Sequence, residues 1–262
     1  MVVGYRSEID EVIAYIHKHL DDPMTLADLA QHISYSPYHF SRMFKRKIGL
    51  SPLYYVSSLR LQKSKELLLY TDLTIRDIGM EIGQQSLGTF TSRFSERVGM
   101  TPAHFRKSIQ QAPDYLASLH KLSDWTVPSL TATSQFAAVT GTVHTSTPFS
   151  GVTLIGLFPK PIPEGMPLFG TLISDTGDFY ITGVLPGKYY LMVTSVGWGM
   201  GAVDFLLPHE TLRGRAKEPI FVTPFSSVRH QEIMLHPPKL DDPPILISLP
   251  LLMKNFLSRV KQ

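Results

Sequence analysis

The feature that most constrains this chain of 262 residues is an internal duplication in its first half. Residues 36–52 and 86–102 share one pattern at an offset of 50 residues. In order, the shared positions are Ser36, Phe40, Phe44, Gly49, Leu50, Ser51 and Pro52 in the first copy, and Ser86, Phe90, Phe94, Gly99, Met100, Thr101 and Pro102 in the second. Such a repeat indicates that one supersecondary unit occurs twice.

A short helix is predicted before each copy. Residues 25–30 match residues 74–79, and Thr25 has an acidic residue three positions later, which is the spacing of a helix capping box. Ser36 followed by proline marks the start of a second helix, and Ser51 followed by proline marks the start of a long third one. Each copy is therefore a helix, a tight turn and a second helix, the helix-turn-helix arrangement whose second helix enters the major groove of DNA.

The second helix of the first copy has one apolar face and several polar ones. Phe40 and Phe44 are four residues apart and share the buried face. The residues that we expect to contact DNA from the other faces are Tyr38, His39, Ser41, Arg42, Lys45 and Arg46. Bidentate contact between Arg42 and a guanine is worth about 1–3 kcal/mol of discrimination, whereas Lys45, Arg46 and Lys47 are expected near phosphates.

The distribution of charge supports this expectation. Residues 1–110 contain 14 Lys and Arg against 11 Asp and Glu, and no acidic residue lies between positions 36 and 49. A solvated basic helix is the alternative explanation of such a cluster. The duplicated context favours contact with DNA.

These motifs resemble those of the AraC-type transcription regulators over about residues 5–107. The resemblance implies an all-α domain with two helix-turn-helix units joined by a long helix at about residues 52–70, each unit placing one helix in successive major-groove turns roughly 34 Å apart. It also implies that Tyr38, Ser41 and Arg42 face bases. Double-stranded promoter DNA and RNA polymerase are the implied partners of a transcription regulator, which is either an activator or a repressor. The absence of cysteine fits a location in the reducing cytoplasm.

The second unit departs from the family pattern. Gln84 stands where an aromatic residue is usual, Gly88 replaces a serine, and Ser92 replaces an arginine. Arg93 is one residue away, but a shift of one residue rotates a side chain by about 100° around a helix. The second unit is therefore expected either to contact mainly phosphates or to read a different base step through Leu87, Thr91 and Arg93.

Beyond Ala137 the pattern changes to alternation of apolar and polar residues with a period of two, which is typical of strands. Turn sequences separate these short strands, and their spacing predicts an all-β sandwich or small barrel. We therefore expect a helical domain at 1–110, a linker at 111–135, a sandwich at 136–240 and a C-terminal tail at 241–262. One turn of helix is expected near 114–121, and the apolar run 245–252 fits either a strand or a helix that packs back.

Residues 137–196 resemble the carboxypeptidase regulatory-like, or transthyretin-like, sandwiches, through the glycine turns and the anchors Phe179 and Tyr189. Later strands are expected at 203–207, 220–222 and 228–235. The resemblance implies a domain that senses a ligand, binds a partner or mediates self-association. Trp198, between glycines, is a candidate for stacking on a sugar ring, although a core tryptophan is the commoner role.

Several classes of protein are excluded by the sequence. The chain has no cysteine, its histidines show no metal spacing, and it has no phosphate loop or nucleophile motif. We expect no enzyme activity, no cofactor, no metal and no membrane span, since no run of about 18 apolar residues occurs. The alternative to a regulator is a carbohydrate- or protein-binding module with a degenerate helical half, an idea that rests on Gln84, Gly88 and Ser92.

Overall fold

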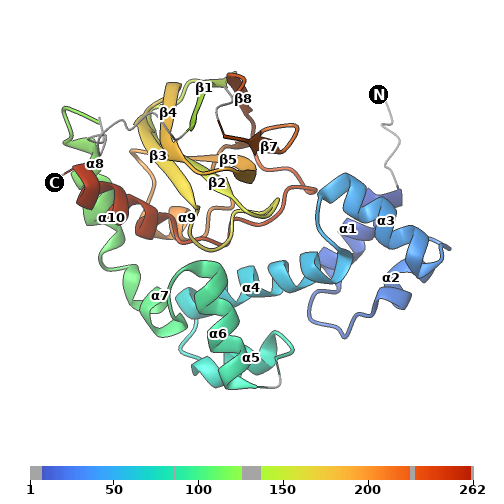
Figure 1. Cartoon of the computed structure of the whole chain (residues 1–262). Helices are drawn as coiled ribbons and strands as arrows, with labels where there is room; N and C mark the ends of the chain where they lie inside the picture. Colours follow the sequence, from blue (N-terminus) through green and yellow to red (C-terminus); the bar gives the residue numbers. More distant parts are fainter. Residues whose placement is uncertain (1–7, 85, 126–136, 225–227, 261–262) are drawn as a thin grey trace.

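The computed structural model describes residues 8–84, 86–125, 137–224 and 228–260. The first part of the chain is helical, as predicted, and its elements are α1 (Glu8–Lys18), α2 (Leu26–His32), α3 (Pro37–Ile48), α4 (Pro52–Tyr70), α5 (Ile75–Glu81), α6 (Leu87–Val98), α7 (Pro102–Ser108) and α8 (Ala112–His120). One helix-turn-helix unit, α2 with α3, lies near one end of α4, and the second, α5 with α6, lies near the other end (Figure 1).

The helix boundaries follow from local capping. The capping box predicted at Thr25 is present, because the Thr25 hydroxyl accepts from the Asp28 backbone N–H and the Asp28 carboxylate accepts from that of Thr25. Ser36 caps α3 by accepting from the backbone N–H of His39 at 3.4 Å. Ser51 precedes α4 but makes no capping hydrogen bond, so proline at the first turn marks that start without the expected cap.

The second part of the chain forms two sheets, built from β1 (Ala137–Thr145), β2 (Gly151–Phe158), β3 (Phe169–Ser174), β4 (Gly177–Val184), β5 (Gly187–Gly197), β6 (Arg213–Arg215), β7 (Ile220–Val222) and β8 (Gln231–Leu235). One sheet has the order β4-β1-β8, with β1 and β8 parallel. The other has the order β3-β2-β5-β6, with β7 also paired to β5. We call residues 137–236 the sheet domain.

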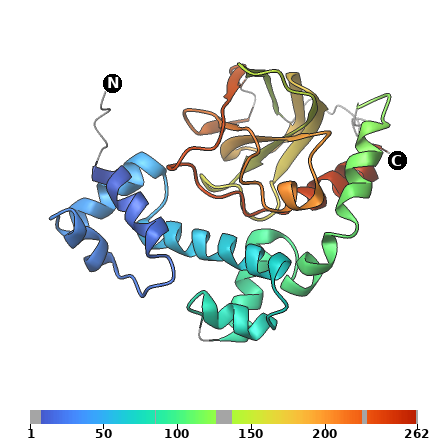
Figure 2. The same cartoon turned by 180° about the vertical axis from the view of Figure 1, so that it is seen from behind.

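Two hydrophobic cores meet at the larger sheet. Ile155 and Leu157 of β2 point toward the smaller sheet, whereas Leu154 and Phe158 belong to a core that continues into the helices. Every residue of β2 is buried, because both faces of this strand are covered. The sheet domain therefore packs directly against the helical domain, over α4 in both views (Figures 1 and 2).

The segments outside the two predicted domains are also structured. Helix α8 lies within the stretch 111–135 that was assigned to a linker, while residues 126–136 lie outside the described residues. The apolar run near the C-terminus leads into a helix, α10 (Leu249–Val260), which packs back beside α8. Of the two possibilities left open for this run, the helix is correct from Leu249 onward, whereas residues 245–248 form neither a helix nor a strand.

One predicted strand is wrong. Of the residues 203–207 predicted as a strand, residues 203–206 lie in a short helix, α9 (Ala202–Leu206). The Asp204 carboxylate accepts a hydrogen bond from the backbone N–H of Gly201 at 2.8 Å, which satisfies a donor at the helix N-terminus. The strand at 220–222 is confirmed, and the strand predicted over 228–235 is confirmed only from Gln231 onward.

Candidate nucleic-acid interface

Helix α3 is fixed by its apolar face. Phe40 and Phe44 are fully buried, their rings meet edge to face at 5.7 Å, and Phe44 meets Tyr55 of α4 in the same way at 5.5 Å. Gly49 ends the helix with a φ of 89°, a conformation that glycine adopts without strain. The rotation of α3 about its own axis is thereby determined, and with it the direction of its polar face.

That polar face is open to solvent. Tyr38 is 73% exposed; His39, Arg42, Lys45 and Arg46 are also exposed, and Ser41 is half-buried. The guanidinium carbon of Arg42 lies 5.7 Å from the centre of the Tyr38 ring, one helical turn away. The sequence-predicted residues of the first unit therefore share one accessible surface, which we call the α3 surface: Tyr38, His39, Ser41, Arg42, Lys45 and Arg46.

Lys47 differs from the expectation. Its Nζ lies 2.5 Å from Oδ1 of Asp10, so this lysine is ion-paired to α1 rather than directed to a phosphate. Because Asp10 is 37 residues earlier in the chain, the local sequence of α3 gave no sign of this pair. The expected phosphate contact of Lys47 is corrected to a role in joining α1 to α3.

Helix α6 repeats this construction. Phe90 and Phe94 are fully buried, and the Ser86 hydroxyl accepts from the Thr89 backbone N–H at the start of the helix. On the opposite side Leu87 is 48% exposed, Arg93 is exposed and Thr91 is half-buried.

Gln84, which departs from the family pattern, has a specific contact. Its side-chain oxygen accepts a hydrogen bond from Nη1 of Arg93 at 3.0 Å. The turn of the second unit therefore orients Arg93, which lies one position after Ser92, where the family pattern has an arginine. Sequence comparison with the family marks both residues as unusual but does not connect them.

A buried ionic cluster joins α6 to the sheet domain, and sequence reasoning missed it. Arg97, near the C-terminal end of α6, donates from Nε to the Glu164 carboxylate at 2.5 Å, and both side chains are at most 7% exposed. Nη2 of Arg97 also donates to the Ser58 hydroxyl of α4 at 2.5 Å. Arg97 and Glu164 are 67 residues apart, and no motif pairs them.

Tyr54 of α4 completes this cluster. Its hydroxyl donates to the Glu164 carboxylate, and its ring lies 4.4 Å from the Arg97 guanidinium carbon. Burial and the Glu164 carboxylate raise the pKa of Tyr54, so the hydroxyl keeps its proton. Lys160 lies 3.0 Å from both Tyr54 and Glu164, and its hydrogen bond to Tyr54 is the main reason that its own pKa is raised.

The segment 159–168, between β2 and β3, contacts both helix-turn-helix units; we call it the bridging loop. At the first unit, a Cβ atom placed on Gly49 would lie 3.1 Å from the Pro161 side chain. At the second unit, the backbone N–H of Gly165 donates to the Arg97 carbonyl at 2.7 Å, beside the Glu164 ion pair. One loop of the sheet domain therefore contacts the C-terminal ends of both second helices.

Trp198 lies away from the helix-turn-helix surfaces. It is half-buried and stacks in a tilted arrangement on the His120 ring of α8, with the ring centres 4.6 Å apart. Trp125 packs nearby at 6.3 Å. The contact of Trp198 with a sugar ring stays a prediction.

The described residues contain neither a metal-binding cluster nor a membrane-spanning helix. Among the residues that the structure describes, no three His, Asp or Glu side chains gather as a metal site would need. Within the same residues, no helix combines the length and the apolar character that a bilayer crossing requires.

Comparisons with known proteins agree with the helical part of this description. Residues 29–108 match a family model described as a helix-turn-helix domain. The chain is 36% identical over 97 residues to the uncharacterized HTH-type transcriptional regulator YobQ of Bacillus subtilis, covering 37% of this chain and 40% of that protein. It is 32% identical over 120 residues to the right origin-binding protein of Escherichia coli K12, covering 46% of this chain and 42% of that protein.

A solved structure is also similar in sequence. The C-terminal domain of AraT, a response regulator from Geobacillus stearothermophilus, is 30% identical, with 39% of this chain and 86% of that one covered and a TM-score of 0.37. The chain spans about two fifths of the length of the two curated relatives. The helical part of the chain contains a helix-turn-helix domain like that of these transcription regulators, and the family match ends at residue 108, before the first strand.

Proposed function

We propose that this chain is a sequence-specific DNA-binding transcription regulator that inserts α3 and α6 into successive major grooves. The observation that carries the proposal is the α3 surface, where exposed basic and polar side chains stand opposite the buried Phe40 and Phe44. The same arrangement recurs on α6, at the other end of α4. The major groove of DNA admits an α-helix, and a chain with two such exposed helices has one for each of two successive grooves.

The residues of α3 have separate roles in this proposal. Arg42, supported by the Tyr38 ring, reads a base edge, while Lys45 and Arg46, further along the exposed side, contact phosphates and add affinity with little sequence preference. On α6, Arg93 is held by Gln84 and acts with Leu87 and Thr91 at the second half-site. We also propose that the DNA site is a promoter, that RNA polymerase is a partner of the bound chain, and that binding activates transcription.

The sheet domain, in the same proposal, controls how the two units sit relative to each other. Its bridging loop contacts Gly49 of the first unit and Arg97 of the second, so a change in this loop is transmitted to both helices. A DNA site with two half-sites requires both helices to be placed together. The sheet domain is therefore suited to modulate affinity when a ligand or partner binds it.

The test is selection of preferred sites from random double-stranded DNA by the full chain and by two variants. Arg42→Ala should lose preference at one base pair, by about 5- to 150-fold, because its bidentate contact is lost. Lys45→Ala should weaken all sequences alike and make the dependence of affinity on salt shallower by about one unit of slope. Identical preferences of the wild type and Arg42→Ala would refute the role of Arg42.

A further inference from the structure

The larger sheet carries a cavity on the face that points away from the smaller sheet. Its volume is about 280 Å³, and it lies between the outer face of β2, β3, β5 and β6, the bridging loop, and the segment that leads into α10. Gly170, Gly156, Met192 and Arg215 stand directly opposite one another on these four strands and form one row across the sheet. Three strand spacings give this row a length of about 14 Å.

The wall of the cavity is mainly apolar. Phe158 and Leu172 belong to the floor, and Leu252 of α10 lies on the opposite side. At the bridging loop, Met166 is 42% exposed and Leu168 is 57% exposed, so apolar side chains also meet solvent at the cavity. An apolar hollow with a few polar groups is typical of small-molecule sites.

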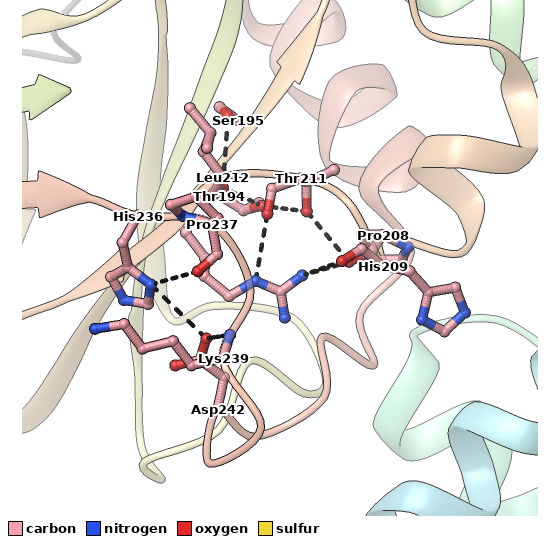
Figure 3. A network of polar contacts seen from close by, with 11 residues as sticks. Thr194, Ser195, Pro208, His209, Thr211, Leu212, His236, Pro237, Lys239 and Asp242 are labelled. Carbon is pink, nitrogen blue, oxygen red and sulfur yellow. Dashed lines mark hydrogen bonds and ion pairs between the residues drawn. The ribbon is translucent and has the colours of Figure 1, made fainter. Parts of the chain in front are cut away.

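Most polar groups of the wall already have protein partners. Arg213 donates to the backbone carbonyls of Pro208, His209 and Thr211, and the His236 ring contacts the carbonyl of Pro237 at 2.8 Å. Asp242 accepts from the backbone N–H of Lys239 at 2.8 Å. Figure 3 shows these polar contacts beside the sheet. The segment 208–213 is joined to the segment 236–242 by two backbone hydrogen bonds between Arg213 and His236, of 3.0 and 2.9 Å.

The remaining charge is positive. Asp242 is the one acidic residue in the described lining, against Arg213, Arg215 and Arg259. Both terminal nitrogens of Arg259 lie 3.3 Å from the Gly170 carbonyl. The side chain of Arg215, exposed at the other end of the row, has no hydrogen bond or ion pair to the described part of the chain, while its backbone pairs with Met192 in the sheet.

We propose that this cavity binds a small amphipathic monoanion, namely a monocarboxylate with an apolar hydrocarbon part. The hydrocarbon part lies over Phe158 and Met192, and the carboxylate lies at Arg215. Burial of the hydrocarbon supplies affinity, and the guanidinium supplies a charge-assisted hydrogen bond that favours an anion over a neutral or cationic analogue. The cavity is thus a candidate effector site.

The position of the cavity connects it to the DNA-binding part, and this step rests on the proposed function. Pro163 and Met166 of the bridging loop line the cavity, while Glu164 and Gly165 between them hold Arg97 of α6. Met166 also lies near Gly99, the residue that ends α6. An occupant that shifts this loop changes the contact with the second unit, and ligand and DNA then alter each other's affinity by the same factor.

The experiment is calorimetric titration of the full chain with three probes that differ only in their head group: 4-phenylbutyrate, 4-phenylbutan-1-ol and 4-phenylbutylamine. We expect saturable binding of one 4-phenylbutyrate, with the alcohol and the amine at least about tenfold weaker. Arg215→Gln should weaken 4-phenylbutyrate by about tenfold, whereas Lys217→Gln, which removes an exposed charge two residues away, should leave its affinity unchanged.

Two tryptophan variants of α10 test whether 4-phenylbutyrate binds inside the cavity. Leu252→Trp fills the cavity and should abolish binding, whereas Lys254→Trp, exposed on another face of α10, should not. Absence of 4-phenylbutyrate binding, equal binding of all three probes, or full binding to Leu252→Trp would overturn the proposed site. A chain that binds 4-phenylbutyrate but no DNA would refute the proposed function and support the cavity.

Discussion

Lys65 of α4 offers a sharp test of how the segment around Ile245, which leads into α10, packs on the helices. Its ammonium group is fully buried and donates to the carbonyl of Ile245 at 3.1 Å and to the side-chain oxygen of Gln62 at 3.4 Å. The Phe105 ring of α7 lies 5.5 Å away, and Glu66 is the acidic neighbour whose charge opposes the shift. Burial lowers the pKa of Lys65 from 10.5 to about 7.

A lowered lysine pKa makes stability rise with pH. Between pH 7 and 10.5 the unfolded chain holds a proton on Lys65 that the folded chain has released, so alkali favours folding. From pH 6 to pH 9 the free energy of unfolding should rise by about 2.7 kcal/mol because of this group. The rise takes place over the two pH units between the folded pKa of about 7 and pH 9, and each pH unit contributes about 1.36 kcal/mol. Below pH 7 the group is charged in both states, and this gain is absent.

The assay is urea unfolding, followed by circular dichroism, of the wild type, Lys65→Met and Lys63→Met at pH 6 and pH 9. Lys65→Met removes the titrating group, so the stability of the wild type relative to this variant should rise by about 2.7 kcal/mol between the two pH values. Lys63→Met, on the exposed side of the same helix, should follow the wild type. A relative stability of wild type and Lys65→Met that stays constant within about 0.5 kcal/mol would refute the burial of this charge.

Three other substitutions test single contacts. Glu164→Ala should lower the free energy of unfolding by about 3–5 kcal/mol, because it leaves the buried Arg97 without its partner, and Glu164→Gln should cost less; equal urea midpoints for Glu164→Ala and the wild type would contradict the cluster. Ser36→Ala should cost about 1 kcal/mol through loss of the α3 cap, and an unchanged thermal midpoint would argue against that cap. Gln84→Ala should leave stability unchanged but weaken selection at the second half-site by freeing Arg93, so an unaltered selected sequence speaks against this pairing.

The sequence predicted the helical half well because its boundaries depend on neighbouring residues. Helix α4 covers the predicted range 52–70, and α3 begins at the proline after Ser36, since proline and a hydroxyl cap mark a helix start locally. The exposed residues of α3 were also predictable, because Phe40 and Phe44 determine which face is buried.

The contacts between distant segments could not be predicted from local patterns. Lys47 pairs with Asp10, and Arg97 with Glu164, across 37 and 67 residues respectively, and a single sequence does not connect such positions. The apolar residues of 203–207 fit a strand, but residues 202–206 form a helix whose N-terminus is capped by the Asp204 carboxylate. The use of the C-terminal run as a helix against α8 depends likewise on tertiary packing.

Hydroxyl-radical footprinting of the full chain on its selected DNA site tests whether one chain places two helices in consecutive major grooves. We expect two protected segments on the same side of the duplex, with centres about 10 base pairs apart. Arg42→Ala should reduce protection at one segment, and Arg93→Ala at the other. A single protected segment, or one pattern of protection shared by all three proteins, would contradict this placement of the two helices.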